Sequence, residues 1–117
     1  MSPLTLSSVI IATHDKARLT AFYRDILGIP ANEQGKLESM GIIIHPARHS
    51  AVQGPPAEPH RIMLTFATGD IHTAARVLGE RGVEFVRMPE QEWWGGWIAT
   101  FRDPDGNFLQ LIQLPAQ

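Results

Sequence analysis

The feature that most constrains the fold of this chain is one short motif that occurs twice, 55 residues apart. Ala12-Thr13-His14-Asp15 returns as Ala67-Thr68-Gly69-Asp70. Both copies follow a β-rich stretch and precede apolar residues at helical spacing. Aspartate is a favoured N-cap, and a glycine past the last turn commonly ends a helix. The sequence therefore predicts two strand–Asp–helix units, whose helices end at Gly28 and Gly82.

Each half of the chain continues with strand-like segments. The predicted strands cover residues 5–13, 29–33, 36–40 and 41–46 in the first half, and 61–68, 83–87, 97–102 and 108–113 in the second. Each half thus reads as a βαβββ module, with module 1 at about 4–46 and module 2 at about 61–114. Residues 47–60 contain Gly54-Pro55-Pro56 and are predicted to be a linker. The fold class is α+β, in a single domain over residues 1–117.

A second motif predicts how the chain ends. Asp103-Pro104-Asp105-Gly106-Asn107 combines residues that reverse the chain, because proline presets φ and glycine accepts positive φ. Strand-like residues flank it on both sides, so a β-hairpin is expected.

This hairpin, with Trp94-Gly95-Gly96 before it, resembles the last strands of the vicinal oxygen chelate superfamily of glyoxalases, extradiol dioxygenases and bleomycin-resistance proteins. Asp15, Phe22-Tyr23 and Leu27-Gly28 resemble its first strand-to-helix unit. The resemblance implies a fold of two βαβββ modules. It implies no single reaction, because one fold hosts many chemistries.

Composition excludes several classes of function. Net charge is −2 with acidic and basic residues interspersed, so neither nucleic-acid nor membrane-surface binding is expected. There is no cysteine, which removes thiolate nucleophiles and zinc–thiolate sites. The chain shows no signal peptide or membrane-spanning stretch, so a cytoplasmic location is expected.

Strand alternation sorts side chains between a helix-covered face and a face left for a ligand. The helix side is predicted to hold Val9, Ile11, Ile62, Leu64, Phe66, Leu109 and Leu111. The predicted ligand contacts on the other face are Ser8, Ile10, His45, Met63, Thr65, Thr100, Arg102, Phe108 and Gln110. Arg102 is expected to bind an acidic group or to pair with Glu92.

The resemblance also implies where metal-using relatives hold their metal. Those positions carry Ser8, Met63, Gln110 and either Ile44 or His45 here. An amide, a hydroxyl and a thioether are poor ligands for hard cations and for non-haem iron. Recruiting His60 instead would shift the strand register and turn Leu64 outward. We therefore expect neither metal nor cofactor, and no catalytic residue is identified.

All three tryptophans lie within Trp93-Trp94-Gly95-Gly96-Trp97. Tryptophan offers a large flat surface for stacking on aromatic ligands. Alternation places Trp97 on the helix side with Ala99 and Phe101. Trp93 and Trp94 are predicted ligand contacts, with packing in a dimer as the alternative.

The leading hypothesis is a metal-independent, homodimeric protein that sequesters an aromatic natural product or antibiotic, similar to the bleomycin-resistance proteins. The alternative is a metal-dependent glyoxalase-like lyase, isomerase or dioxygenase. A structural dimer without a ligand is a third possibility, which leaves the apolar groove unexplained. Metal analysis separates the first two, and a ligand screen separates the first from the third.

Overall fold

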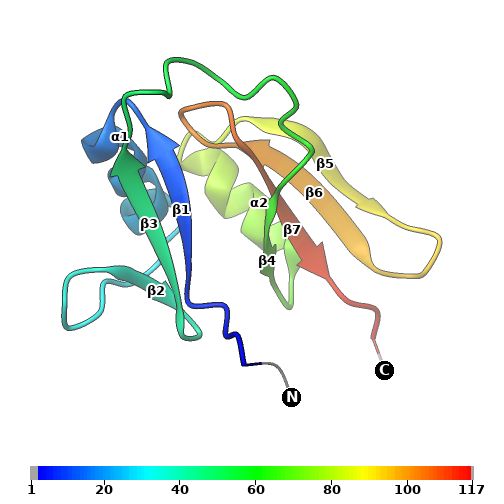
Figure 1. The fold of residues 1–117 in the computed structure, drawn as a ribbon. Coiled ribbons are helices and arrows are strands. Elements are labelled where there is room, and N and C mark those ends of the chain that lie inside the picture. The colour runs from blue at the N-terminus through cyan, green and yellow to red at the C-terminus, as the bar shows by residue number, and fades with distance from the viewer. Residues whose placement is uncertain (1–2, 117) are drawn as a thin grey trace. The chain divides into compact units, whose positions relative to one another are not determined.

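The computed structural model describes residues 3–116, which divide into two compact units at Gln53 and Gly54. The division falls inside the predicted linker, and the predicted domain of residues 1–117 extends at its ends beyond the described residues. The first unit contains β1 (Ser8–Thr13), α1 (Lys16–Ala21), the π-helix η1 (Phe22–Ile26), β2 (Leu37–Ser39) and β3 (Ile42–Arg48) (Figure 1). The second contains β4 (Leu64–Ala67), α2 (Ile71–Glu80), β5 (Phe85–Gln91), β6 (Trp97–Arg102) and β7 (Phe108–Gln113). The predicted α+β class is confirmed.

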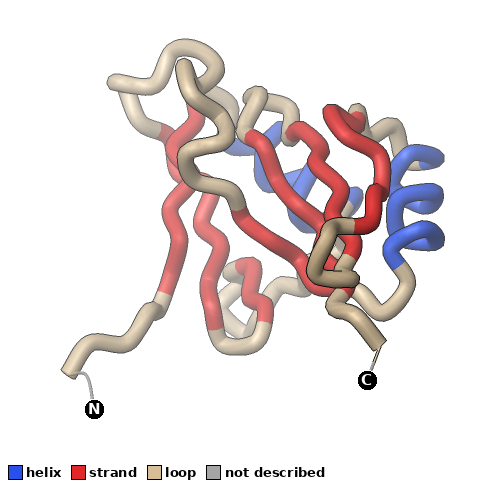
Figure 2. The backbone as a smooth tube through the Cα atoms, turned by 90° about the vertical axis from the view of Figure 1, so that its right-hand side faces the viewer, coloured by secondary structure: helices blue, strands red, loops and turns tan. Residues whose placement is uncertain are grey.

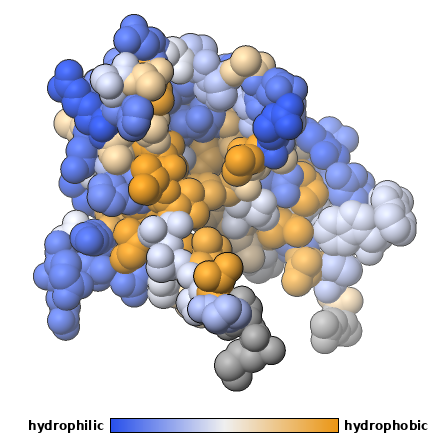
Figure 3. Space-filling view, viewed as in Figure 1, coloured by the Kyte–Doolittle hydropathy of each residue, from blue (hydrophilic) through white to orange (hydrophobic). Residues whose placement is uncertain are grey.

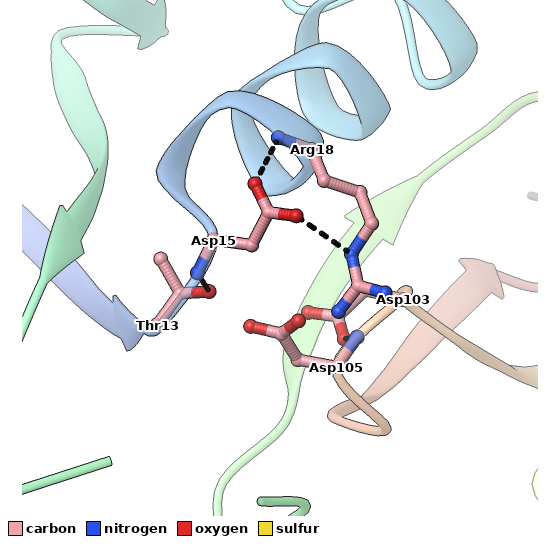
Figure 4. Close-up of polar contacts among 5 residues, drawn as sticks. All are labelled: Thr13, Asp15, Arg18, Asp103 and Asp105. Carbon is pink, nitrogen blue, oxygen red and sulfur yellow. Dashed lines mark hydrogen bonds and ion pairs between the residues drawn. The ribbon is translucent and has the colours of Figure 1, made fainter. Parts of the chain in front are cut away.

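The repeated motif builds the same helix start in both units. The Thr13 hydroxyl accepts a hydrogen bond from the Asp15 amide at 3.0 Å, and the Asp15 carboxylate accepts one from the Arg18 amide at 3.1 Å (Figure 4). In the second unit Thr68 accepts from the Asp70 amide at 3.2 Å. The N-caps predicted from the repeat are therefore confirmed, and threonine is the part of the motif that fixes the turn before each helix.

Both helical segments end where the glycines predict, although the first changes from an α-helix to a π-helix before its end. Gly28 has φ of +77° and Gly82 of +88°, the left-handed conformation that glycine adopts without a steric penalty. The segment after Asp15 was expected to be one α-helix. Instead, the α-helix ends at Ala21 and five residues continue as a π-helix.

The first sheet has three strands in the order β1-β3-β2, with β1 parallel and β2 antiparallel to β3. The predicted strand at residues 29–33 is wrong, because only Ala31 forms an isolated bridge, with Leu37. Pro30 lacks a donor for a ladder. The Asn32 side chain accepts from the Gln34 and Lys36 amides, both at 2.9 Å, and so turns the chain at this point.

The second sheet has the predicted four strands, in the order β4-β7-β6-β5. Helix α2 lies along one face of this sheet (Figures 1 and 2). Leu109 and Leu111 are 1% and 5% exposed, as alternation predicts for the helix side. Trp97 is also on that side, since its ring meets His72 of α2 edge-on at 4.7 Å between centroids.

Ile62 departs from the predicted pattern. It was placed on the helix side, but it lies before the start of β4 and is 81% exposed. Among residues 3–116, neither α2 nor any other helix is long and apolar enough to cross a membrane.

Candidate functional site

The sheet of the second unit has one face that α2 does not cover, which we call the helix-free face. Strand pairing assigns to it Thr65, Ala67, Arg87, Glu90, Ile98, Thr100, Arg102, Phe108, Gln110 and Ile112. One row across the sheet is polar, because Gln110 pairs with Thr65 on one side and with Thr100 on the other. The next row contains the apolar residues Ala67, Ile112 and Ile98 and ends at Glu90, and Ile98 is only 7% exposed. An apolar surface with a few placed polar groups is the usual build of a small-molecule site.

The polar row is partly connected by hydrogen bonding. The Gln110 amide donates to the Thr65 hydroxyl at 3.4 Å. Thr65 is exposed, Gln110 is half-buried and Thr100 is 6% exposed. Thr65 and Gln110, both predicted ligand contacts, are thus brought together in an accessible place, whereas Thr100 lies below the surface.

Arg87 belongs to the same row, although the sequence pattern did not indicate it. It pairs with Thr100, whereas Phe85 pairs with Phe101, so the β5–β6 register shifts by one residue between them. Without that shift Arg87 would lie opposite Ala99, on the helix side. Its guanidinium pairs with Glu92 at 3.1 Å and with Glu90 at 3.4 Å, and the hydrogen bond with Glu92 raises the pKa of Arg87.

Arg102 and Phe108 lie at one end of the face and are already in contact with protein groups. The prediction that Arg102 pairs with Glu92 is wrong, because Arg102 pairs with Glu84, whose backbone carbonyl also accepts from the Arg102 amide at 3.1 Å. The Arg102 guanidinium lies over the Phe108 ring at 5.5 Å, and His60 meets this ring edge-on at 4.7 Å. Phe108 is therefore only 9% exposed.

The predicted aromatic contacts lie at the tip of the β5–β6 hairpin, beyond the other end of the face. Trp93 is 95% exposed and Trp94 is 37% exposed. The Trp94 ring lies directly on Gly96, where an added Cβ would come within 1.8 Å of ring atom Cζ3. Thr100 lies three residues along β6 from Trp97, or about 10 Å at the usual rise of a strand. The tryptophans and the polar row are therefore neighbours along the sheet without being in one cluster.

A hollow of about 500 Å³ lies at the hairpin-tip end of the same sheet, and no sequence pattern predicts it. Its lining comes from the ends of β4 and β7 and from the chain that follows each, namely Ala67, Thr68, Gly69, Ile112, Gln113, Leu114 and Ala116. Drug-sized ligands typically occupy pockets of roughly 300–1,000 Å³. Gln113 pairs with Trp97, which places the hollow and the tryptophan hairpin at one end of the sheet.

The remaining predicted ligand residues lie elsewhere. Ile10 pairs with His45 in the first unit, on the face of that sheet that carries Ser8, and Ile10 is 67% exposed. Hydrophobic side chains gather over β1 and β3 on the side viewed in Figure 3. Met63 is half-buried in the second unit, one residue before β4.

The comparisons with known proteins identify the family. The model of the glyoxalase/bleomycin resistance protein/dioxygenase superfamily matches residues 5–111. The chain belongs to this superfamily. No curated protein sequence matches the chain significantly.

Solved structures agree with this membership of the superfamily. A glyoxalase/bleomycin resistance protein/dioxygenase from Nocardioides is 23% identical with a TM-score of 0.78, over 98% of this chain and 86% of the other. A family enzyme from Burkholderia phytofirmans is 19% identical with a TM-score of 0.78, over 95% of this chain and 99% of the other. A protein from Agrobacterium tumefaciens is 25% identical with a TM-score of 0.73, over 97% and 96%. At this identity the first two likenesses establish the fold alone.

The residues at the positions where the resemblance implies a metal do not fit a hard divalent cation. Met63 offers a thioether, Ser8 a hydroxyl and Gln110 an amide, and that amide already donates to Thr65. The fourth position is Ile44 or His45, so it adds at most one imidazole. Carboxylates and imidazoles are the ligands that such ions prefer. Over residues 3–116, no three His, Cys, Asp or Glu side chains come together as a possible metal centre.

Proposed function

We propose that this protein binds a mostly aromatic small molecule without a metal, and that it acts by sequestering the ligand rather than by transforming it. One observation carries the proposal: the helix-free face presents a hydrogen-bonding row that contains Gln110, a position where metal-using relatives are expected to present a ligand. Gln110 and Thr65 offer an amide and a hydroxyl, and Ala67 and Ile112 flank them with accessible apolar surface. Such a face can hold an uncharged polar group and an apolar ring together.

The volume and the lining of the hollow support an aromatic ligand. Its volume of about 500 Å³ suits a drug-sized molecule, and small or apolar residues such as Ala67, Ile112 and Leu114 line much of it. Trp93 and Trp94 lie in the hairpin tip at the same end of the sheet, and Trp93 at 95% and Trp94 at 37% exposure keep surface open to solvent. Stacking on an exposed indole costs little rotamer entropy and favours flat ligands.

We further propose that the protein works as a homodimer and that the ligand lies in a dimer cleft. Exposed apolar side chains support this, namely Leu4, Leu6 and Ile10 in the first unit at 83%, 67% and 67% exposure. Apolar residues exposed close together commonly mark interfaces. Sedimentation at micromolar concentration should give twice the mass of the 13.0 kDa chain, and a monomer would contradict this part of the proposal.

Binding is tested by titrating planar polycyclic compounds into the protein and following tryptophan fluorescence. Trp93→Ala or Trp94→Ala should weaken binding of a compound that quenches, by about thirtyfold if the lost ring is a hot spot worth roughly 2 kcal/mol. Met88→Ala is the matched control, because Met88 is an exposed apolar residue of β5 outside the hairpin tip. If both tryptophan variants stay folded and bind as well as the parent, the tryptophans do not contact the ligand.

A metal-dependent enzyme remains the competing function. It predicts that ferrous iron, zinc, nickel or manganese raises the melting temperature and confers turnover of hemithioacetals or catechols. Either result, abolished by His45→Ala or Gln110→Ala, would replace sequestration with catalysis.

A further inference from the structure

The two lysines of the chain line one pocket in the first unit. Lys16 and Lys36 are the only lysines in 117 residues, the other eight basic residues being arginines. Lys16 begins α1 and Lys36 lies just before β2, yet both border a cavity of about 180 Å³. This cavity is lined by residues of the first unit alone, whereas the ligand face proposed above belongs to the second.

Local structure holds both lysine backbones in place. Lys16 and Thr20, which also lines the pocket, are one helical turn apart on the same face of α1. On the other side, the Asn32 side chain accepts from the Lys36 amide at 2.9 Å. The backbone amide of Asn32 in turn donates to the backbone carbonyl of Lys36 at 2.7 Å. The lysines are therefore presented by ordered turns and not by a loose loop.

Neither ammonium group is neutralised within the part of the chain that the structure describes. Arg24 and Arg76, in contrast, pair with Asp25 at 2.8 Å and with Glu80 at 2.9 Å. Asp15 and Glu38, two acidic neighbours of the lysines in sequence, have other partners. Asp15 caps α1 and faces Arg18, and Glu38 accepts from Asn32 at 3.0 Å. An anion entering the pocket would meet two positive charges for which residues 3–116 supply no ion-pair partner.

The inner wall of the pocket is apolar, with one polar atom that lacks a partner. Leu37 and Ile44 are each 5% exposed, and Pro46 is also buried. The Thr20 hydroxyl is buried and finds no hydrogen-bond partner among residues 3–116. A buried hydroxyl without a partner is costly, so a bound acceptor would relieve that cost.

We propose that this pocket binds a small organic anion whose carboxylate or phosphate oxygens lie between Lys16 and Lys36 and whose short apolar part contacts Leu37, Ile44 and Pro46. The volume of the cavity limits the size of the anion, because 180 Å³ corresponds to about six water-sized groups at ~30 Å³ each. The aromatic natural products proposed for the helix-free face of the second unit are too large for it.

The test is titration of the intact protein with sodium butyrate, 1-butanol and inorganic phosphate, followed through the backbone amide signals of Lys36, Leu37 and Ile44 by NMR. Butyrate should give saturable shifts, whereas 1-butanol, which lacks the charge, should give none. Phosphate should bind more weakly than butyrate, because it cannot use the apolar wall.

Charge-removing variants identify the groups responsible. Lys16→Gln and Lys36→Gln should each weaken butyrate binding by about fivefold, the effect of one favourable but partly exposed ion pair. Arg48→Gln is the matched control, since it removes one exposed cation of the same unit that does not line the pocket, and it should leave the affinity within about twofold. Unchanged amide spectra establish that each variant is folded.

Several outcomes would overturn the proposal. These are the absence of saturable butyrate shifts, equal shifts with 1-butanol, and an Arg48→Gln effect as large as that of the lysine variants. An affinity for phosphate equal to that for butyrate would contradict the proposal that the anion is organic.

Discussion

The side-chain amide of Gln110 donates a hydrogen bond to the hydroxyl of Thr65 across 3.4 Å and so joins β7 to β4 on the helix-free face. The resemblance places Gln110 where metal-using relatives usually carry a carboxylate. An amide there can donate and accept, so it can recognise a neutral polar group on a ligand but is a poor ligand for a hard cation.

The first prediction concerns metals. Zinc, nickel, manganese or ferrous iron should not raise the melting temperature appreciably, because the donor groups are too weak. Calorimetry or a thermal shift assay would detect a bound metal, because a ligand at a concentration of one hundred times its Kd stabilises the native state by about 2.7 kcal/mol. A clear upward shift that Gln110→Ala removes would contradict this prediction.

The second prediction concerns the contact of Trp94 with Gly96. Gly96→Ala should destabilise the protein by about 1–3 kcal/mol, because the new methyl group displaces the indole ring. Urea unfolding and the tryptophan emission maximum report the change. Gly54→Ala is the control, since no atom lies within 4 Å of a Cβ there. Equal stability of both variants would show that the ring does not rest on Gly96.

The third prediction concerns Met40, which turns the chain between β2 and β3. Its φ is +51°, followed by +84° at Gly41, and its side chain is 99% exposed. Asparagine tolerates this left-handed conformation and Asn-Gly favours such hairpins, so Met40→Asn should stabilise the fold by about 0.5–1 kcal/mol. Met88→Asn, an equally polar change in an extended strand, should not stabilise it. A loss of stability in Met40→Asn by urea unfolding would count against the assigned turn.

The fourth prediction concerns pH. The hydrogen bond from the Thr73 hydroxyl holds the pKa of Asp70 below its ordinary value of about 3.8. A depressed pKa means that the ionised cap stabilises the fold above that ordinary value, and that this contribution is lost as pH falls through the folded-state pKa. The stability advantage of the parent over Asp70→Asn should therefore shrink as pH drops below 3.8. An advantage that is constant across this range would contradict the assigned role.

Regular parts of the fold could be predicted from sequence because local chemistry determines them. The Thr13–Asp15 and Thr68–Asp70 pairs fix two helix starts, and alternation identified Leu111 as buried. The strand predicted at residues 29–33 does not form, because Pro30 and the turn at Asn32 outweigh the apolar character of this segment.

The candidate site depends more on tertiary contacts, which alternation does not encode. A register shift in β5 turns Arg87 to the helix-free face, and His60 from the linker covers Phe108. The hollow depends on where the chain runs after Ala67 and Ile112, which no local pattern specifies.

The central claim is metal-independent binding of an aromatic ligand, and isothermal titration of a planar polycyclic compound into chelator-treated protein tests it most directly. The account predicts saturable binding whose Kd is the same in chelator and in added zinc or ferrous iron, with the compound recovered unchanged. Binding that disappears in chelator and returns with metal, or a compound converted to product, would contradict it.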